Sequence, residues 1–312
     1  MKKNPDVSVT IGKLHLANPV MVASGTFGYM EEFKDFLDCS KLGAIVTKTI
    51  TVKPRTGNPA PRTCETPAGM LNSIGLENPG VTAFIEEKLE KAARVGPPVI
   101  VSIASEGGLD EFAVLTKQLD VYSSVAAFEV NISCPNVKHG AAAHERRLTA
   151  QDAQATAEVI TTVRGLTEKT IIAKLSPNVT DIVEIAQAAE SAGADAICLV
   201  NTLSGMSIDV KTRRSKIAMI SGGLSGPAIR PVAVRMVWEL FRAVKIPLIG
   251  TGGITDTASA LEFLIAGATA VSVGTQNFIN PRVTIEIIKG LREYLIENDI
   301  ADITALTGSL QT

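Results

Sequence analysis

The sequence predicts an α/β protein built as a closed (β/α)₈ TIM barrel, with an N-terminal β-hairpin cap and long loops on its C-terminal face. Short apolar runs rich in β-branched residues recur along the chain with amphipathic stretches between them, as in parallel strands that alternate with helices. No linker divides these units and no GxGxxG motif opens a first helix, which favours a closed barrel over an open sheet. We therefore expect a single domain over residues 1–312.

The first element is expected to be a β-hairpin that caps the bottom of the barrel. Apolar residues alternate from Val7 to Leu16 around Gly12 and Lys13, which is typical of two strands joined by a turn. The barrel strands follow, each a continuous apolar run of the kind that is buried on both faces. They are expected at Val20–Ala23, Ala44–Thr47, Val99–Ile103, Phe128–Ile132, Ile171–Leu175, Ala196–Val200, Pro247–Gly250 and Ala270–Val273.

Amphipathic stretches between these runs predict the helices. The clearest one follows the fifth strand, where Thr180 is expected as the N-cap residue and Gly193 as the stop signal. Between them, apolar residues from Ile182 to Ala189 share one helical face.

Three long segments, at about 48–79, 133–148 and 201–226, are expected to be neither strand nor helix. Each begins where a predicted strand ends. In a barrel those ends share one face, where the catalytic loops lie, and loops of this length are commonly lids or binding loops.

Composition and charge narrow the classes of function. The chain is 46% hydrophobic and 20% charged, and its formal net charge is −2. Near-neutral charge and 4% aromatic residues argue against a nucleic-acid partner, which requires cations for phosphates and rings for stacking. No apolar run approaches the roughly 18–20 residues that cross a bilayer, so we expect a cytoplasmic protein without a membrane partner. The four cysteines form no CxxC pair, which argues against a disulfide framework or a metal site.

Glycines follow the seventh and eighth predicted strands, at Gly252, Gly253 and Gly274. They would let main-chain N–H groups approach an anion, and the loops after these two strands are the recurrent phosphate site of barrels. The alternative is that the glycines only make tight turns. Their occurrence at both strand ends favours phosphate binding.

Two lysines lie at predicted strand ends. Lys174 is flanked by apolar residues and Lys48 directly follows an apolar run, so both side chains would point into the barrel or its mouth. Lysine is rarely buried without a partner, which suggests an anionic ligand or a developing negative charge. The alternative is that their flexible stems carry the ammonium groups out to solvent.

Cys134 follows the fourth strand in the string NISCPN. By its residue type alone it is better interpreted as a small buried hydrophobic residue than as a functional one.

Several strings together resemble the dihydroorotate dehydrogenase family, and they cover nearly the whole chain. Within this family, the chain most resembles the class 1B catalytic subunits. The position where the family carries its catalytic base is Cys134 here, and the loop that follows reads NVKHG. The strings are GAIVTKTITVKPRTGNPAPR, NSIGLENPG, NISCPN, AKLSPNVTDI, VNTLSGMSID, SGGLSGPAIRP and LIGTGGITD.

The resemblance implies one FMN per chain and oxidation of dihydroorotate to orotate in pyrimidine biosynthesis. Carried over by position, the residues expected to line FMN are Ser24, Lys48, Thr49, Asn131, Lys174, Val200, Gly226, Gly252, Gly253, Gly274 and Thr275. Those expected to hold the dihydroorotate are Lys48, Asn72, Ser73, Ile74, Gly75, Leu76, Asn131, Asn201 and Thr202.

In the resemblance, Cys134 is the base that removes the C5 proton of dihydroorotate while hydride leaves C6 for the flavin. The chemistry suits the residue, since a thiol has an unperturbed pKa of about 8.5 and a base works best near the operating pH. A cation at Lys174 would likewise suit the anion of a reduced flavin. The resemblance thus changes our interpretation of Cys134 from a packing residue to a catalytic one.

The class 1B resemblance implies partners as well. We expect a homodimer that binds an electron-transfer subunit carrying FAD and a [2Fe–2S] cluster, giving a heterotetramer that reduces NAD⁺. Three alternatives remain: a class 1A enzyme that uses fumarate, a dihydropyrimidine dehydrogenase-like enzyme, and a flavin-binding barrel without catalysis.

Two strings depart from the family's pattern. Ser102 stands where the family usually has an asparagine near the flavin, which implies that this contact is weakened or replaced by a water. The string HGAAAHE at 139–145 replaces the usual glycine pair in the loop expected to cover the substrate.

Overall fold

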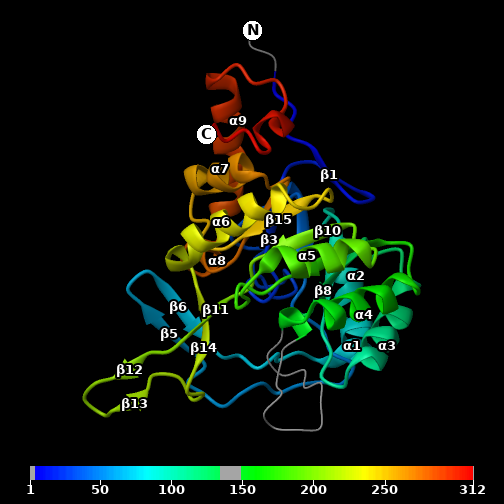
Figure 1. The fold of residues 1–312 in the computed structure, drawn as a ribbon, viewed down its shortest axis with the longest axis vertical. Coiled ribbons are helices and arrows are strands. Elements are labelled where there is room, and N and C mark those ends of the chain that lie inside the picture. Colours follow the sequence, from blue (N-terminus) through cyan, green and yellow to red (C-terminus); the bar gives the residue numbers. More distant parts are fainter. Residues whose placement is uncertain (1–3, 134–148, 312) are drawn as a thin grey trace.

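The computed structural model describes residues 4–133 and 149–311 and has a closed barrel of parallel strands at its centre (Figure 1). The predicted fold class is confirmed, and every predicted barrel strand is present with ends that differ by at most one residue. The strands are β3 (Val20–Val22), β4 (Ala44–Val46), β7 (Val99–Ile103), β8 (Ala127–Asn131), β9 (Thr170–Lys174), β10 (Ala196–Leu199), β15 (Leu248–Thr251) and β16 (Ala270–Val273).

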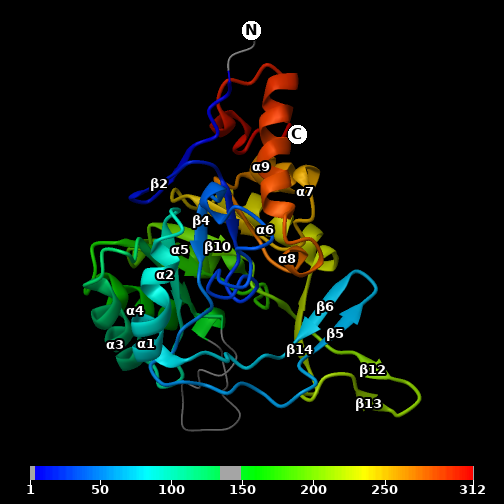
Figure 2. The same ribbon diagram turned by 180° about the vertical axis from the view of Figure 1, so that it is seen from behind.

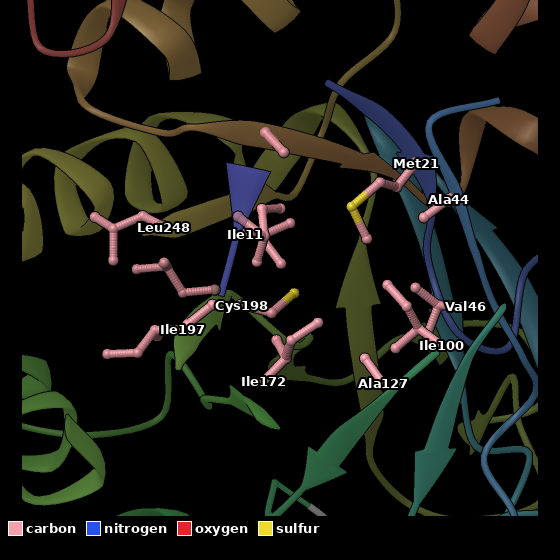
Figure 3. Close-up of a cluster of buried hydrophobic side chains, with 14 of the residues drawn as sticks. Ile11, Met21, Ala44, Val46, Ile100, Ala127, Ile172, Ile197, Cys198 and Leu248 are labelled. Atoms are coloured by element: carbon pink, nitrogen blue, oxygen red, sulfur yellow. The ribbon is translucent and has the colours of Figure 1, made fainter. Parts of the chain in front are cut away.

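The barrel interior is filled by side chains from neighbouring strands. Figure 3 shows Met21, Val46, Ile100 and Ile172 in this cluster, and each is at most 2% exposed. Branched apolar residues close the middle of the barrel. A ligand can therefore enter only at an end of the barrel, and the strand ends decide which residues it meets.

The N-terminal hairpin covers the bottom of the barrel, as predicted. Its strands β1 (Val9–Ile11) and β2 (Leu14–Leu16) pair antiparallel. The main-chain N–H of Lys13 donates to Thr170 Oγ1 at 2.8 Å, where β9 begins, and the fully buried Ile11 lies in the interior cluster (Figure 3). The long loops at the opposite end are thereby left as the accessible face.

Helices surround the barrel (Figures 1 and 2). None that the structure describes is long and apolar enough to span a membrane. They are α1 (Gly80–Phe84), which continues through a π-helical turn (Ile85–Leu89) into α2 (Glu90–Ala93), α3 (Leu109–Asp120), α4 (Ala153–Arg164), α5 (Ile182–Ser191), α6 (Arg230–Phe241), α7 (Thr257–Ala266), α8 (Gln276–Ile279) and α9 (Val283–Glu297). Short 3₁₀ turns lie at Cys39–Lys41, Thr149–Gln151, Pro227–Ile229 and Ile303–Leu306.

The N-cap of α5 is Asp181, so the prediction of Thr180 was wrong by one residue. The Asp181 carboxylate accepts from the main-chain N–H groups of Val183 and Glu184, and its charge favours the positive end of the helix. The predicted stop is close, because α5 ends at Ser191 and Gly193 follows with a φ of 99°.

Two of the three long segments contain strands, which corrects the expectation that they lack regular structure. Together they form an antiparallel sheet in the order β11-β14-β6-β5, here called the flap sheet, from which a small hairpin projects (Figures 1 and 2). Residues 134–148 of the third segment lie outside the described residues. The flap-sheet strands are β5 (Thr63–Thr66), β6 (Gly69–Asn72), β11 (Leu203–Gly205) and β14 (Gly222–Ser225), and the hairpin strands are β12 (Ile208–Asp209) and β13 (Arg214–Ser215).

Candidate functional site

A cavity of about 870 Å³ lies at the C-terminal ends of the barrel strands. Its floor and walls come from the residues that follow β3, β4, β8, β9, β10, β15 and β16. Flap-sheet residues, among them Thr63, Met70 and Gly223, complete the lining. This volume is within the range of about 300–1,000 Å³ typical of cofactor and small-molecule sites.

Every described residue that the sequence predicted for the cofactor or the substrate lines this one cavity. The exception is Cys134, which lies outside the described residues, although Ser133 before it is part of the lining. The residues brought together are Ser24, Lys48, Thr49, Asn72, Ser73, Ile74, Gly75, Leu76, Asn131, Lys174, Val200, Asn201, Thr202, Gly226, Gly252, Gly253, Gly274 and Thr275.

Lys174 provides a buried cation at the cavity. Its side chain is 5% exposed, so the alternative in which the stem carries the ammonium to solvent is wrong. The Nζ donates to Ser24 Oγ at 3.1 Å and lies 3.5 Å from Glu129 Oε1. Burial is the strongest influence on the pKa of Lys174 and acts to lower it, but the charge and hydrogen bonding of Glu129, together with Cys198, outweigh burial and raise the pKa overall. The group is therefore charged at neutral pH.

Lys48, two residues after the end of β4, brings a second ammonium group to the same cavity. It is half-buried. An ideal Cβ on Gly25 would lie 3.4 Å from Lys48 Nζ, so this part of the lining is close-fitting. Two cations in one cavity suit an anionic ligand.

Amide and hydroxyl groups form a connected wall beside these cations. Asn131 Nδ2 donates to Thr49 Oγ1 at 3.4 Å, and Asn131 Oδ1 accepts from Asn201 Nδ2 at 3.5 Å. The hydroxyls of Thr49 and Ser102 lie 3.0 Å apart. Ser102 is fully buried and stands behind Thr49, outside the cavity lining. Its hydroxyl acts on the site through Thr49.

Residues 72–76, here called the β6 loop, are held in place by a segment that sequence reasoning did not assign a role. The main-chain N–H of Asn58 donates to the Ile74 carbonyl and its side-chain amide to the Ser73 carbonyl, both at 2.9 Å. Arg55 Nε donates to the Gly75 carbonyl at 3.1 Å. Asn58 also lines the cavity. It lies inside a quoted motif, but its loop partners are not readable from the sequence.

Asn178 is a second functional candidate that sequence reasoning missed. It lines the cavity, its Nδ2 donates to the Thr202 carbonyl at 2.9 Å, and its Oδ1 accepts from the Ser204 N–H at 2.8 Å. It thereby holds the start of β11 against the barrel. The sequence did contain a signal for this role. Asn178 lies four residues after Lys174, just beyond the end of a barrel strand, where an amide side chain is typically a binding residue.

The glycines that follow β15 and β16 are glycines for different structural reasons. Gly252 and Gly253 have φ values of 129° and 74°, and a Cβ on Gly253 would lie 2.7 Å from Arg230 Cβ. Turn geometry therefore accounts for both. Gly274 is not in the left-handed region, and among the residues that the structure describes its Cβ would meet Ala23 and Thr26 alone, at 3.7 and 3.9 Å.

The chemistry of the lining suits a flavin nucleotide. Both neighbours of a Gly274 Cβ belong to the cavity lining, so a side chain at this position would occupy space that the cavity now offers. A phosphate could approach the main chain there, and the ammonium of Lys174 could neutralise an anionic ring. The residues present thus suit the group that the sequence resemblance implies.

Comparison with known proteins agrees with the family resemblance that the sequence motifs indicate. A family model described as dihydroorotate dehydrogenase matches residues 6–295. The chain is 54% identical over 307 residues to "Dihydroorotate dehydrogenase B (NAD(+)), catalytic subunit" of Trichlorobacter lovleyi, covering 98% of this chain and 99% of that protein. Proteins of the same description are 53% identical over 308 residues in Geotalea uraniireducens and 51% identical over 309 residues in Geobacter metallireducens, with 99% of both chains covered in each case.

Proposed function

The chain belongs to the dihydroorotate dehydrogenase family, and we propose that it is the catalytic subunit of an NAD⁺-linked member that oxidises dihydroorotate to orotate in pyrimidine biosynthesis. The observation that carries this proposal is that one cavity unites two cations, several asparagine amides and a glycine-lined end. These are the groups that an anionic flavin and a planar carboxylate substrate require. Family membership implies a flavin, and FMN, one per chain, is our proposal for its identity.

In this proposal the FMN contacts divide between phosphate and ring. Main-chain groups at Gly252, Gly253, Gly274 and Thr275 would bind the phosphate, and the ammonium of Lys174 would neutralise negative charge on the ring. The remaining FMN residues are Ser24, Lys48, Thr49, Asn131, Val200 and Gly226, all of which line the cavity. The bound FMN would accept the hydride from C6 of dihydroorotate.

The substrate is proposed to lie against the amide wall and the β6 loop. Asn72, Asn131 and Asn201 offer both donors and acceptors, with Thr202 beside them, and Lys48 offers a cation for the carboxylate. Asn131 and Asn201 are already linked at 3.5 Å, which fixes the orientation of the two amides. The β6 loop would then set the position of the ring.

Cys134 is proposed as the base that removes the C5 proton. The proposal rests on its place in NISCPN, directly after Ser133. The Ser133 hydroxyl donates to the Lys174 carbonyl at 2.9 Å, which ties the end of this strand to β9 at the cavity. A thiol suits the role, since its acidity is closer to neutrality than that of a serine hydroxyl.

Electrons must leave the flavin for another acceptor. The words "catalytic subunit" in the relatives' names imply a partner subunit, and we propose one that carries FAD and a [2Fe–2S] cluster and binds a homodimer of this chain in a heterotetramer. The cytoplasmic location stays a prediction.

The test is the spectrum of the purified chain before and after anaerobic addition of dihydroorotate. A flavin band that dihydroorotate bleaches and dihydrouracil does not would support the cofactor and substrate together. Bleaching by dihydrouracil would instead support the dihydropyrimidine dehydrogenase alternative, and no bleaching by either would support the non-catalytic barrel.

The acceptor is tested separately by steady-state turnover. We expect the isolated chain to reduce artificial dyes but not NAD⁺. Efficient NAD⁺ reduction by this polypeptide alone would contradict the two-subunit proposal. Rapid fumarate reduction would move the chain to the class 1A alternative.

A further inference from the structure

Beneath the cavity, the ammonium of Lys174 faces the carboxylate of Glu129 inside the barrel. Glu129 lies on β8 and Lys174 on β9, which are neighbouring strands. Their side chains are 3% and 5% exposed, and Nζ lies 3.5 Å from Oε1. Glu129 Oε1 makes no hydrogen bond to any part of the chain that the structure describes. Glu129 therefore acts on Lys174 mainly through its charge.

Such a pair is a costly feature of an apolar interior. Burying two ions costs several kcal/mol each, and well-packed apolar residues are often as stabilising as the pair. The interior cluster around the pair is apolar: Ile172, two residues before Lys174 on β9, is 1% exposed and lies in it (Figure 3). Stability of the barrel is thus a poor reason for placing both charges here.

The other groups near Lys174 cannot replace the carboxylate. Cys198, on the neighbouring strand β10, lies in the interior cluster beside Ile172 (Figure 3). Burial raises the pKa of its thiol to about 12, so the thiol is neutral near pH 7, and Ser24 is an uncharged hydrogen-bond partner. Of the carboxylates in residues 4–133 and 149–311, only Glu129 is paired with Lys174.

We propose that Glu129 is a positioning residue that keeps the ammonium of Lys174 charged and fixed at the cavity, so that the cavity presents a permanent cation to the flavin. The proposal deepens, and rests on, the proposed function as a flavoprotein. Without the carboxylate, burial would favour the neutral amine. Flavin binding would then require a proton to be taken up by Lys174, and affinity would fall as the pH rises.

The test compares the dissociation constant of FMN for the wild-type chain and Glu129→Gln between about pH 7 and pH 9, where the flavin phosphate stays doubly ionised. The constant is measured by the change in flavin fluorescence. We expect little pH dependence for the wild type and weakening by about tenfold per pH unit for Glu129→Gln. Cys198→Ala is the matched control, because it changes the same cluster without removing a charge, and should behave as the wild type.

Two further variants separate the proposed role from a structural one. Glu129→Asp keeps the charge and should restore pH-independent binding. The double variant Glu129→Gln with Lys174→Met should bind FMN weakly at every pH, because no titrating amine is left. It also removes both buried charges, so it keeps the comparison usable if Glu129→Gln alone folds poorly. A pH dependence that persists in the double variant, or pH-independent binding by Glu129→Gln, would overturn the proposal.

Failure of the proposed function is distinguishable from failure of this inference. If the wild-type chain binds no FMN, the flavoprotein function fails. The role of Glu129 is then read from the titration of the Lys174 side chain by NMR of selectively labelled lysine, assigned with Lys174→Met. Glu129→Gln should titrate several pH units below the wild type, and equal titration curves would refute the role.

Discussion

Replacing Gly274 with alanine separates the proposed phosphate contact from the stability of the fold. Within residues 4–133 and 149–311, an added Cβ at Gly274 meets Ala23 and Thr26 alone, at ordinary van der Waals distances, and its φ is not positive. At Gly253 the same change meets Arg230 Cβ at 2.7 Å and a carbonyl oxygen at 2.8 Å, with φ at 74°. The two glycines border one cavity but respond differently to the same substitution.

The expected magnitudes follow from these contacts. Gly274→Ala should leave the chain as stable as the wild type or more stable by about 0.4–1 kcal/mol, because it restricts the unfolded chain without strain. Gly253→Ala should cost about 2–5 kcal/mol, from the left-handed backbone and the close contacts. Gly274→Ala should nevertheless weaken FMN binding by about 10- to 100-fold, the equivalent of one hydrogen bond to a charged group.

The assays are urea unfolding of the flavin-free chain and titration with FMN followed by fluorescence. Gly165→Ala serves as the matched control. Gly165 has a φ of −65° after α4, its Cβ would lie 3.5 Å or more from its neighbours, and it is remote from the cavity. It should share any gain in stability and leave FMN affinity unchanged. Wild-type FMN affinity in a correctly folded Gly274→Ala chain would refute the placement of the phosphate.

Three further predictions concern other parts of the site. Cys134→Ser should keep FMN but slow its anaerobic reduction by dihydroorotate about 10²–10⁴-fold, with partial recovery at higher pH; stopped-flow rates equal to wild type near neutrality would mean another base. Lys174→Ala should lower the free energy of unfolding by about 3–5 kcal/mol, since it leaves Glu129 unpaired, and should weaken FMN binding or lower its potential. Folding raises the pKa of Lys174 above 10.5, so the stabilisation by the Lys174–Glu129 pair is present below pH 10.5 and is lost as the pH rises through the folded pKa. If denaturant titrations give Lys174→Ala the same free energy of unfolding as the wild type below pH 10.5, this prediction is wrong. Asn58→Ala should raise KM for dihydroorotate in a dye-linked assay with FMN content and kcat little changed, and an unchanged KM would mean that the β6 loop holds its position without it.

The sequence predicted the barrel closely because its strands are continuous apolar runs, and burial on both faces leaves them few alternatives. The flap sheet was missed for the opposite reason. Its strands read TCET, GMLN, LSG and GGLS, which are too polar or too rich in glycine to be predicted as strands. They form because Asn72 pairs with Gly223 across 151 positions of the chain, and no local pattern encodes such a partner.

The same contrast holds for the site. Residues at barrel strand ends, such as Lys174 and Asn131, were predictable because the fold itself places them on one face. Glu129 and Asn58 were not assigned a role, since each acts through another residue. Glu129 follows an ordinary alternation along β8, and only the position of the neighbouring strand shows that its carboxylate lies under Lys174. Asn58 likewise has a role only through the carbonyls of a loop that follows later in the chain.

The two halves of the cavity are therefore built differently. The half proposed for FMN is formed mostly by the ends of barrel strands, whose positions are fixed by a closed ladder and a filled interior; Gly226, which follows flap-sheet strand β14, is the exception. The half proposed for dihydroorotate depends on the flap sheet and the β6 loop, which the Arg55 and Asn58 contacts hold from outside the barrel. Local opening requires less free energy where few apolar contacts are buried. Because the flap-sheet strands are mostly only partly buried, we expect the flap side to open at a lower free-energy cost than the strand ends that carry Lys174 and Gly274.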